Sequence, residues 1–106
     1  MKNHKVKCSN FEIANDSAFT LIAGPCQLEN EAHAIKISTE LKKITSDLGI
    51  NFIYKTSFDK ANRTSLKGKR GMGLEKSLPI FDKIRKDWSV PVLTDIHTAE
   101  QCSIIS

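Results

Sequence analysis

One stretch of the chain decides its fold, and it reads TLIAGPCQLENEAHAIKISTELKKITSDLGINFIYK over residues 20–55. It opens with a short apolar run closed by Gly-Pro, which is typical of a buried strand that ends in a turn. Over residues 30–48 the apolar residues recur at intervals of three and four, the period of an amphipathic helix. Residues 50–54 are apolar apart from one asparagine, which favours a strand covered on both faces, as in a parallel sheet. The stretch therefore predicts a β-α-β unit.

The two ends of this helix carry signals of their own. Asn30 can cap the helix start, because its side-chain oxygen can accept a hydrogen bond from a free backbone N–H. Gly49 stands at the position of a C-terminal cap, where glycine tolerates the left-handed backbone that ends many helices. The caps therefore predict a helix over the interval between these two residues.

A second unit follows the first. Apolar residues recur with helical spacing over residues 74–84, but Pro79 lies inside this stripe. We expect this helix either to begin near Ser77, where proline is tolerated, or to be kinked. Residues 90–94 predict a third strand, and residues 98–105 predict the start of a third helix. The order β-α-β-α-β-α indicates a parallel sheet with right-handed crossovers.

Two architectures fit this order, an open doubly wound sheet and a (β/α)₈ TIM barrel. A barrel needs roughly 250 residues, whereas this chain has 106. In the barrel interpretation, residues 19–106 are the first three strands and helices, the N-terminal β-α-β-α-β portion of an incomplete barrel. Residues 1–18 are polar and mixed, and they predict an N-terminal extension with a hairpin around Asn15-Asp16.

The composition is that of a soluble globular protein with a net charge of +4. No apolar run is long enough to cross a membrane, and no signal-peptide core follows the basic N-terminus. Three widely spaced cysteines indicate neither a disulfide framework nor a zinc knuckle. We therefore expect a cytoplasmic protein with reduced thiols and no membrane partner.

Basic side chains are concentrated in one segment after the second strand. Its six cations are Lys55, Lys60, Arg63, Lys67, Lys69 and Arg70. Hydroxyl and amide donors are interleaved with them: Thr56, Ser57, Asn62, Thr64 and Ser65. Two interpretations are open, a solvated basic loop and a phosphate site, and the position after a buried strand favours phosphate, which Arg and Lys both bind. A nucleic-acid interface is disfavoured, because Phe58 is the only aromatic residue in this segment that could stack on a base.

Three further polar residues lie at predicted strand ends. Asp95 and His97 are two residues apart, so their side chains point to the same side and can share a proton, a metal ion or a water molecule. The alternative is a helix-capping aspartate beside a surface histidine. Cys26 follows the Gly-Pro turn. A single buried cysteine is more often a packing residue than a ligand, and a metal site there would need partners from other strands.

Four segments of the chain resemble motifs of the 3-deoxy-D-manno-octulosonate 8-phosphate synthase family. They are residues 22–26 (IAGPC), 54–64 (YKTSFDKANRT), 69–75 (KRGMGLE) and 94–97 (TDIH). The likeness extends from about Phe19 to Gln101, and the second segment is long and specific. The Gly-Pro-Cys element is shared with the related aldoheptonate (DAHP) synthases, the alternative assignment. Those would carry Lys-Pro-Arg-Thr where this chain has KANRT at residues 60–64.

The resemblance implies an enzyme of lipopolysaccharide inner-core biosynthesis, homotetrameric in the family, that condenses phosphoenolpyruvate with D-arabinose 5-phosphate and releases phosphate. It also implies roles for individual residues. Lys55, Ser57 and Lys60 would contact phosphoenolpyruvate. Asn62, Arg63 and Thr64 would hold arabinose 5-phosphate, and Asp95 and His97 would lie at the reacting centre. Thr64 stands where serine is usual, and it keeps the hydroxyl.

The residue at position 26 divides the family into two types. Members with cysteine there are metal-dependent, and members with asparagine are not. The resemblance therefore implies a divalent metal ion of the zinc, iron or manganese type, with Cys26 as one ligand. The other ligands, a histidine, a glutamate and an aspartate, belong to later strands in the family. We accordingly expect this N-terminal fragment to be inactive alone, and the alternative to a synthase is a non-catalytic remnant.

Overall fold

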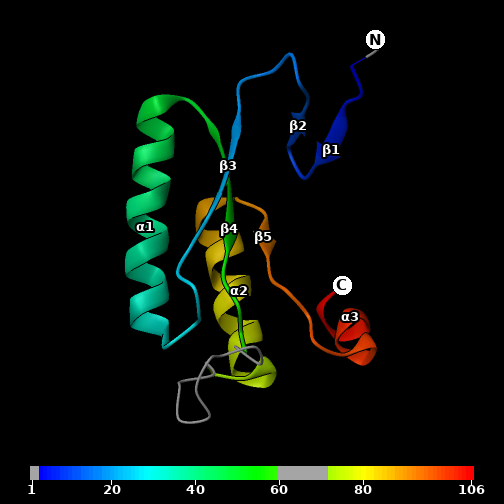
Figure 1. Cartoon of the computed structure of the whole chain (residues 1–106). Helices are drawn as coiled ribbons and strands as arrows, with labels where there is room; N and C mark the ends of the chain where they lie inside the picture. Colours follow the sequence, from blue (N-terminus) through cyan, green and yellow to red (C-terminus); the bar gives the residue numbers. More distant parts are fainter. Residues whose placement is uncertain (1–2, 60–71) are drawn as a thin grey trace.

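The computed structural model describes residues 3–59 and 72–106 of the chain (Figure 1). Within them lie strands β1 (Val6–Cys8), β2 (Phe11–Ile13), β3 (Thr20–Ala23), β4 (Asn51–Lys55) and β5 (Val92–Leu93), and helices α1 (Glu31–Leu48), α2 (Leu74–Trp88) and α3 (Ala99–Ile105). β1 and β2 pair as an antiparallel hairpin, and β3, β4 and β5 form a parallel sheet in that order. The chain is thus a mixed α/β structure, as the alternating pattern predicts. None of the described helices combines the length and apolar character that a membrane span requires.

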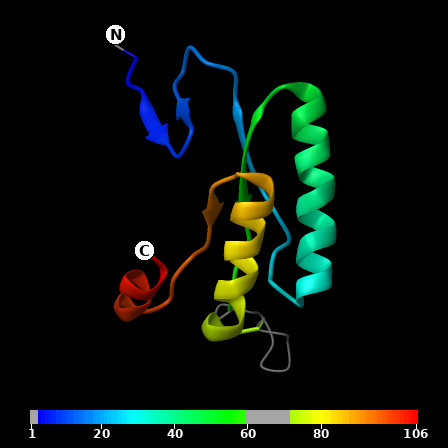
Figure 2. The same ribbon diagram turned by 180° about the vertical axis from the view of Figure 1, so that it is seen from behind.

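Helices α1 and α2 pack on one face of the parallel sheet. α2 lies behind the sheet in Figure 1 and in front of it when the molecule is turned around in Figure 2. The hydrophobic core gathers side chains from both helices, from the sheet and from the adjoining segments: Leu28, Ala34, Phe52, Tyr54, Phe58, Ile80, Phe81, Ile84 and Val90. Burial of these side chains is the main force that holds the helices against the sheet.

The strand register shows which residues face the helices. Ala23 lies opposite Tyr54, and Tyr54 lies opposite Val92, and all three belong to the core or pack against it. Successive side chains of a strand point to opposite faces, so the neighbouring residues point away from the helices. Ile22 is 52% exposed and Leu93 is 44% exposed. The described helices therefore leave the second face of the sheet uncovered.

Helix α1 begins and ends as its sequence predicts. The Asn30 side chain accepts a hydrogen bond from the backbone N–H of His33 at 2.8 Å. Gly49 adopts the left-handed conformation with a φ of 67°, and its N–H donates to the backbone oxygen of Ser46. Both cap predictions are confirmed.

Helix α2 differs from the prediction at its start. The helix begins at Leu74, ahead of Ser77, and continues through Pro79 to Trp88. Of the two alternatives, a start near Ser77 is therefore wrong, and a kink at Pro79 stays a prediction. Pro79 lacks the N–H that would bond to the preceding turn, but the apolar face of the helix offsets this loss, since it includes Ile84, which has no exposed surface.

The N-terminal hairpin forms, but its turn lies earlier than predicted. Ser9 and Asn10 connect β1 to β2, and Ser9 takes a positive φ of 54°, which tight hairpin turns require. Asn15-Asp16 instead belong to a turn between β2 and β3, where the N–H of Ser17 donates to the backbone oxygen of Ala14 at 3.2 Å. The prediction of a hairpin around Asn15-Asp16 is wrong because pairing of the two short strands, rather than turn-forming residues alone, places the hairpin.

The single tyrosine of the chain, Tyr54, is fully buried in the sheet. Its hydroxyl has no hydrogen-bond partner among the described residues, and burial raises its pKa to about 12. An unfolded tyrosine titrates near pH 10, so the folded protein holds the proton more tightly. The contribution of Tyr54 to stability is therefore complete below about pH 10 and is lost as the pH rises towards the folded pKa of about 12.

Substitution of Tyr54 with phenylalanine tests this environment. We expect Tyr54→Phe to leave the free energy of unfolding at neutral pH unchanged or slightly higher, because it removes a buried hydroxyl that has no partner within residues 3–59 and 72–106. The stability of the wild-type chain should fall above about pH 10 as Tyr54 ionises, and the variant should not show this fall. Urea unfolding of both chains at pH values below and above about 10 measures the difference. If the free energy of unfolding at neutral pH fell by more than about 1.5 kcal/mol, the upper value for one hydrogen bond, the Tyr54 hydroxyl would have a hydrogen-bond partner after all.

Candidate functional site

The segments that follow β3 and β4 are joined beyond the ends of the strands. The Thr56 hydroxyl donates to the backbone oxygen of Pro25 at 2.8 Å, and the N–H of Leu28 donates to the backbone oxygen of Ser57 at 2.8 Å. Gln27 and Ser57 also pair as an isolated parallel bridge. Because Thr56 and Ser57 are fully buried, these bonds form an ordered edge at the carboxyl ends of the two strands.

Two backbones approach each other closely at Gly24. A Cβ atom built on Gly24 would lie 1.9 Å from the backbone oxygen of Lys55 and 2.8 Å from its carbonyl carbon. Both distances are shorter than real Cβ contacts, so only glycine fits without a shift of the backbone. The Gly-Pro element thus sets the spacing between the segment of Cys26 and the segment of Lys55 and Ser57.

Five predicted site residues lie at every second position along the three parallel strands, in step with the residues that point to the uncovered face of the sheet. Each series starts within a strand and continues past its end: Ile22, Gly24 and Cys26 along β3, Ile53, Lys55 and Ser57 along β4, and Leu93, Asp95 and His97 along β5. Lys55 is half-buried, whereas its neighbours Tyr54 and Thr56 have no exposed surface. Alternation along the strands therefore directs the predicted polar residues to the side that α1 and α2 do not cover.

Asp95 lies where charged and polar groups from two strands meet. Burial alone would raise the pKa of its carboxyl group, but the Ser57 hydroxyl, its own backbone, and the charges of Lys55 and His97 together lower this pKa. Asp95 is therefore a carboxylate at neutral pH, and it can accept a hydrogen bond or balance a cation. Asp95 Oδ1 and Ser57 Oγ are both buried, and neither has a hydrogen-bond partner of ordinary geometry among the described residues, as expected of atoms that a ligand contacts.

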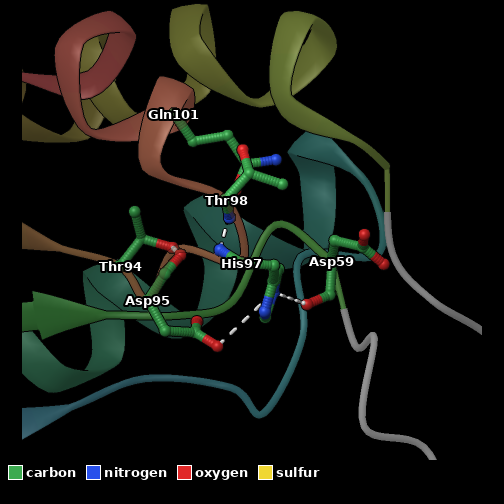
Figure 3. A network of polar contacts seen from close by, with 6 residues as sticks. All are labelled: Asp59, Thr94, Asp95, His97, Thr98 and Gln101. Atoms are coloured by element: carbon green, nitrogen blue, oxygen red, sulfur yellow. Dashed lines mark hydrogen bonds and ion pairs between the residues drawn. The ribbon is translucent and has the colours of Figure 1, made fainter.

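His97 lies beside Asp95, as their spacing predicts. Its Nε2 atom is 3.6 Å from Asp95 Oδ2 and 2.6 Å from the backbone oxygen of Asp59 (Figure 3). The ring of Phe58 is tilted against the imidazole, with 5.8 Å between the ring centroids. The His97 side chain is 21% exposed and that of Asp95 is 41% exposed, so both remain accessible from solvent.

Gln101 belongs to the same network, although it is not among the site residues predicted from the sequence. Its side-chain oxygen Oε1 accepts hydrogen bonds from the backbone N–H groups of His97 at 2.8 Å and Thr98 at 3.3 Å (Figure 3). The signal for this contact was present, because glutamine three residues after a threonine is the pattern of a helix capping box.

The other predicted site residues are less constrained by the described structure. Cys26 is an exposed free thiol, and within residues 3–59 and 72–106 no three His, Cys, Asp or Glu side chains come together as metal ligands. One thiol by itself does not hold a metal ion in place. Lys60, Asn62, Arg63 and Thr64 lie outside the described residues.

Residues 3–106 match the model of the DAHP synthetase I family. The chain belongs to this family. Among the proteins similar to it, one from Chelativorans sp. (strain BNC1) is 54% identical over 104 residues, and one from Mesorhizobium japonicum is 52% identical over 104 residues. Both are named 2-dehydro-3-deoxyphosphooctonate aldolase, another name for the synthases whose motifs the chain resembles, and the resemblance is confirmed. Each alignment covers 98% of this chain and 38% of the relative, so the chain spans about 38% of the length of these curated relatives.

Proposed function

We propose that this chain forms part of the active site of a synthase that condenses phosphoenolpyruvate with D-arabinose 5-phosphate. The products would be 3-deoxy-D-manno-octulosonate 8-phosphate and phosphate. The observation that carries the proposal is the identity of 52–54% with aldolases over 98% of the chain. The geometry supports it, since Ser57, Asp95 and His97 come together at the carboxyl ends of parallel strands, where barrel enzymes have their active sites.

The architecture that we propose for the whole enzyme is a (β/α)₈ barrel. The parallel unit from β3 to α3, within residues 19–106, would supply the first three of its strands and helices. Three of eight units make up about 38% of a barrel, and the chain spans 38% of its relatives. The uncovered face, which carries the exposed Ile22 and Leu93, would then face the interior of the barrel, and the β1–β2 hairpin would lie outside it.

In this proposal each group has a chemical task. Lys55, Ser57 and Lys60 bind the phosphate and carboxylate of phosphoenolpyruvate, because cations and hydroxyl donors hold anionic oxygens. Asn62, Arg63 and Thr64 bind the phosphate of arabinose 5-phosphate. The C2–C3 π electrons of phosphoenolpyruvate then form a bond from C3 to C1 of the sugar aldehyde, and the aldehyde oxygen takes up a proton as its C–O π bond breaks. Water adds at the cationic C2 and releases one proton. The C2–O bond to the phosphate then breaks, and the phosphate leaves with the remaining hydroxyl proton as the C2 ketone forms. The Asp95 carboxylate is ionised at neutral pH because its pKa is lowered, so it would balance positive charge at this centre and be available to accept a proton.

The metal ion is also part of the proposal. A thiolate at Cys26 suits a divalent ion of the zinc, iron or manganese type, and the free, exposed thiol leaves that atom accessible. The further ligands would come from residues other than the described ones. When bound, such an ion polarises a carbonyl or a water oxygen.

The assembly and location that we propose follow from the same family. The enzyme would be a cytoplasmic homotetramer that takes part in lipopolysaccharide core biosynthesis, with no nucleic-acid or membrane partner. The chain by itself would be inactive, because its sheet has unpaired edges among the described strands and the described residues form no group of three metal-ligating side chains.

A hybrid protein tests the proposed activity. Residues 1–106 are joined to the part of the Chelativorans relative that follows its matched segment, and phosphate release is measured. We expect release from phosphoenolpyruvate only when arabinose 5-phosphate is also present, loss of this release on addition of a chelator, and no release by the chain alone. In the hybrid, Lys55→Met should abolish phosphate release, whereas Lys36→Met, an exposed change on α1, should not. A folded, soluble hybrid that releases no phosphate from these two substrates would favour the non-catalytic remnant.

A further inference from the structure

His97 is held by contacts from two separate segments, the loop after β4 and helix α3. Its ring packs against Phe58, its Nε2 atom lies 2.6 Å from the backbone oxygen of Asp59, and its backbone N–H donates to Gln101 Oε1 at 2.8 Å. Figure 3 shows Gln101 of α3 reaching back to the turn that precedes the helix, while the imidazole points away towards Asp59 and Asp95. The two hydrogen bonds of His97 therefore constrain its backbone and its side chain separately.

We propose that Gln101 is a positioning residue that sets the direction and the tautomer of the His97 imidazole. One side-chain oxygen of Gln101 accepts from two consecutive backbone N–H groups, those of His97 and Thr98. These N–H groups lie at the start of α3, where helices leave backbone donors without an intrahelical partner. Fixing the backbone of His97 fixes its Cα–Cβ bond, and the imidazole can then reach the oxygen of Asp59.

The contact with Asp59 determines which ring nitrogen carries the proton. A backbone oxygen only accepts hydrogen bonds, so Nε2 must be the protonated nitrogen of neutral His97, and Nδ1 keeps the lone pair. Without Gln101 the backbone at His97 would lose its side-chain acceptor, and the short Nε2–H contact would compete with other ring orientations. The neutral imidazole would then populate both tautomers.

Nitrogen-15 NMR of histidine-labelled protein tests this proposal in the full chain. Spectra are recorded near pH 8–9, where an ordinary imidazole is neutral, and His97 is assigned by the signal lost in His97→Asn. We expect one Nε2–H tautomer in the wild-type chain and in Gln101→Glu, whose carboxylate oxygen accepts the same bonds. We expect a mixture of both tautomers in Gln101→Leu and in Gln101→Asn, whose shorter side chain does not reach both N–H groups. Glu100→Leu, an exposed change on the same helix, is the matched control and should match the wild type.

The outcomes separate this proposal from the proposed function. A single Nε2–H tautomer in both Gln101→Leu and Gln101→Asn would overturn it, and Gln101→Asn decides the matter if Gln101→Leu does not fold. A second test uses the hybrid synthase, and in this test the inference rests on the proposed function. There, kcat should fall up to about 100-fold in Gln101→Leu and stay near the value of the unsubstituted hybrid in Gln101→Glu. If the tautomer changes while even the unsubstituted hybrid is inactive, the positioning role stands and the proposed function fails.

Discussion

Gly24→Ala is expected to destabilise the chain by about 3 kcal/mol, the upper range for overpacking a rigid site. The added Cβ would lie 1.9 Å from the backbone oxygen of Lys55. A flexible side chain could move away from such a contact, but here the obstacle is the backbone of the central strand β4. Urea unfolding of the wild-type and variant chains measures the difference. The denaturation midpoint should shift with little change in slope, since the surface exposed on unfolding is the same.

The matched control is a second glycine whose surroundings are open. Gly49 has a φ of 67° and nothing within 4 Å of a built Cβ atom. Gly49→Asn should change the free energy of unfolding by less than about 1 kcal/mol, because asparagine also adopts the left-handed conformation. Equal losses in the two variants would show that β3 and β4 do not approach closely at Gly24.

Asp95→Asn is expected to lower the rate of the hybrid synthase by about 10²–10⁴-fold, the range for removal of a general acid or base. Asparagine keeps the shape of the side chain but loses the negative charge that Lys55 and His97 face. The lowered pKa of Asp95 means that the carboxylate persists as the pH falls below the ordinary value. Any stability that it adds is complete above the unfolded pKa and is lost as the pH falls through the lower folded pKa.

Phosphate release at saturating substrate measures the effect of Asp95→Asn, and the substitution of a distant aspartate controls for loss of charge. Asp87 pairs with Lys83 on the exposed side of α2, with an Nζ to Oδ2 distance of 2.8 Å. Asp87→Asn should leave the rate within about twofold, because exposed ion pairs contribute at most about 1 kcal/mol to stability. A rate for Asp95→Asn within tenfold of the unsubstituted hybrid would remove Asp95 from the reacting centre.

Much of the candidate site could be predicted from the sequence, because neighbouring parallel strands run in the same direction and therefore end at the same edge of the sheet. The carboxyl ends of β3, β4 and β5 meet at one edge, and a period of two places Lys55, Asp95 and His97 on one face. The prediction that Asp95 and His97 point to the same side is confirmed by the 3.6 Å between Nε2 and Oδ2. The roles predicted for Lys60 and Arg63 stay predictions, since both residues lie outside the described ranges.

Local signals determined the elements of this protein. Residue spacing predicted the two long helices and the three parallel strands, and side-chain chemistry predicted the caps of α1 at Asn30 and Gly49. Each of these features depends on residues close together in the chain, where steric limits and backbone hydrogen bonds act without regard to the rest of the molecule.

Tertiary structure decided the features that depend on distant residues. Pro79 is tolerated inside α2 because the helix packs on the core, and the hairpin turn at Ser9 is set by the pairing of two short strands. The acceptor of the His97 proton is the backbone oxygen of Asp59, a residue 38 positions away. A backbone oxygen carries no signature in the sequence, because every residue has one, so only the folded chain shows which of them a side chain reaches.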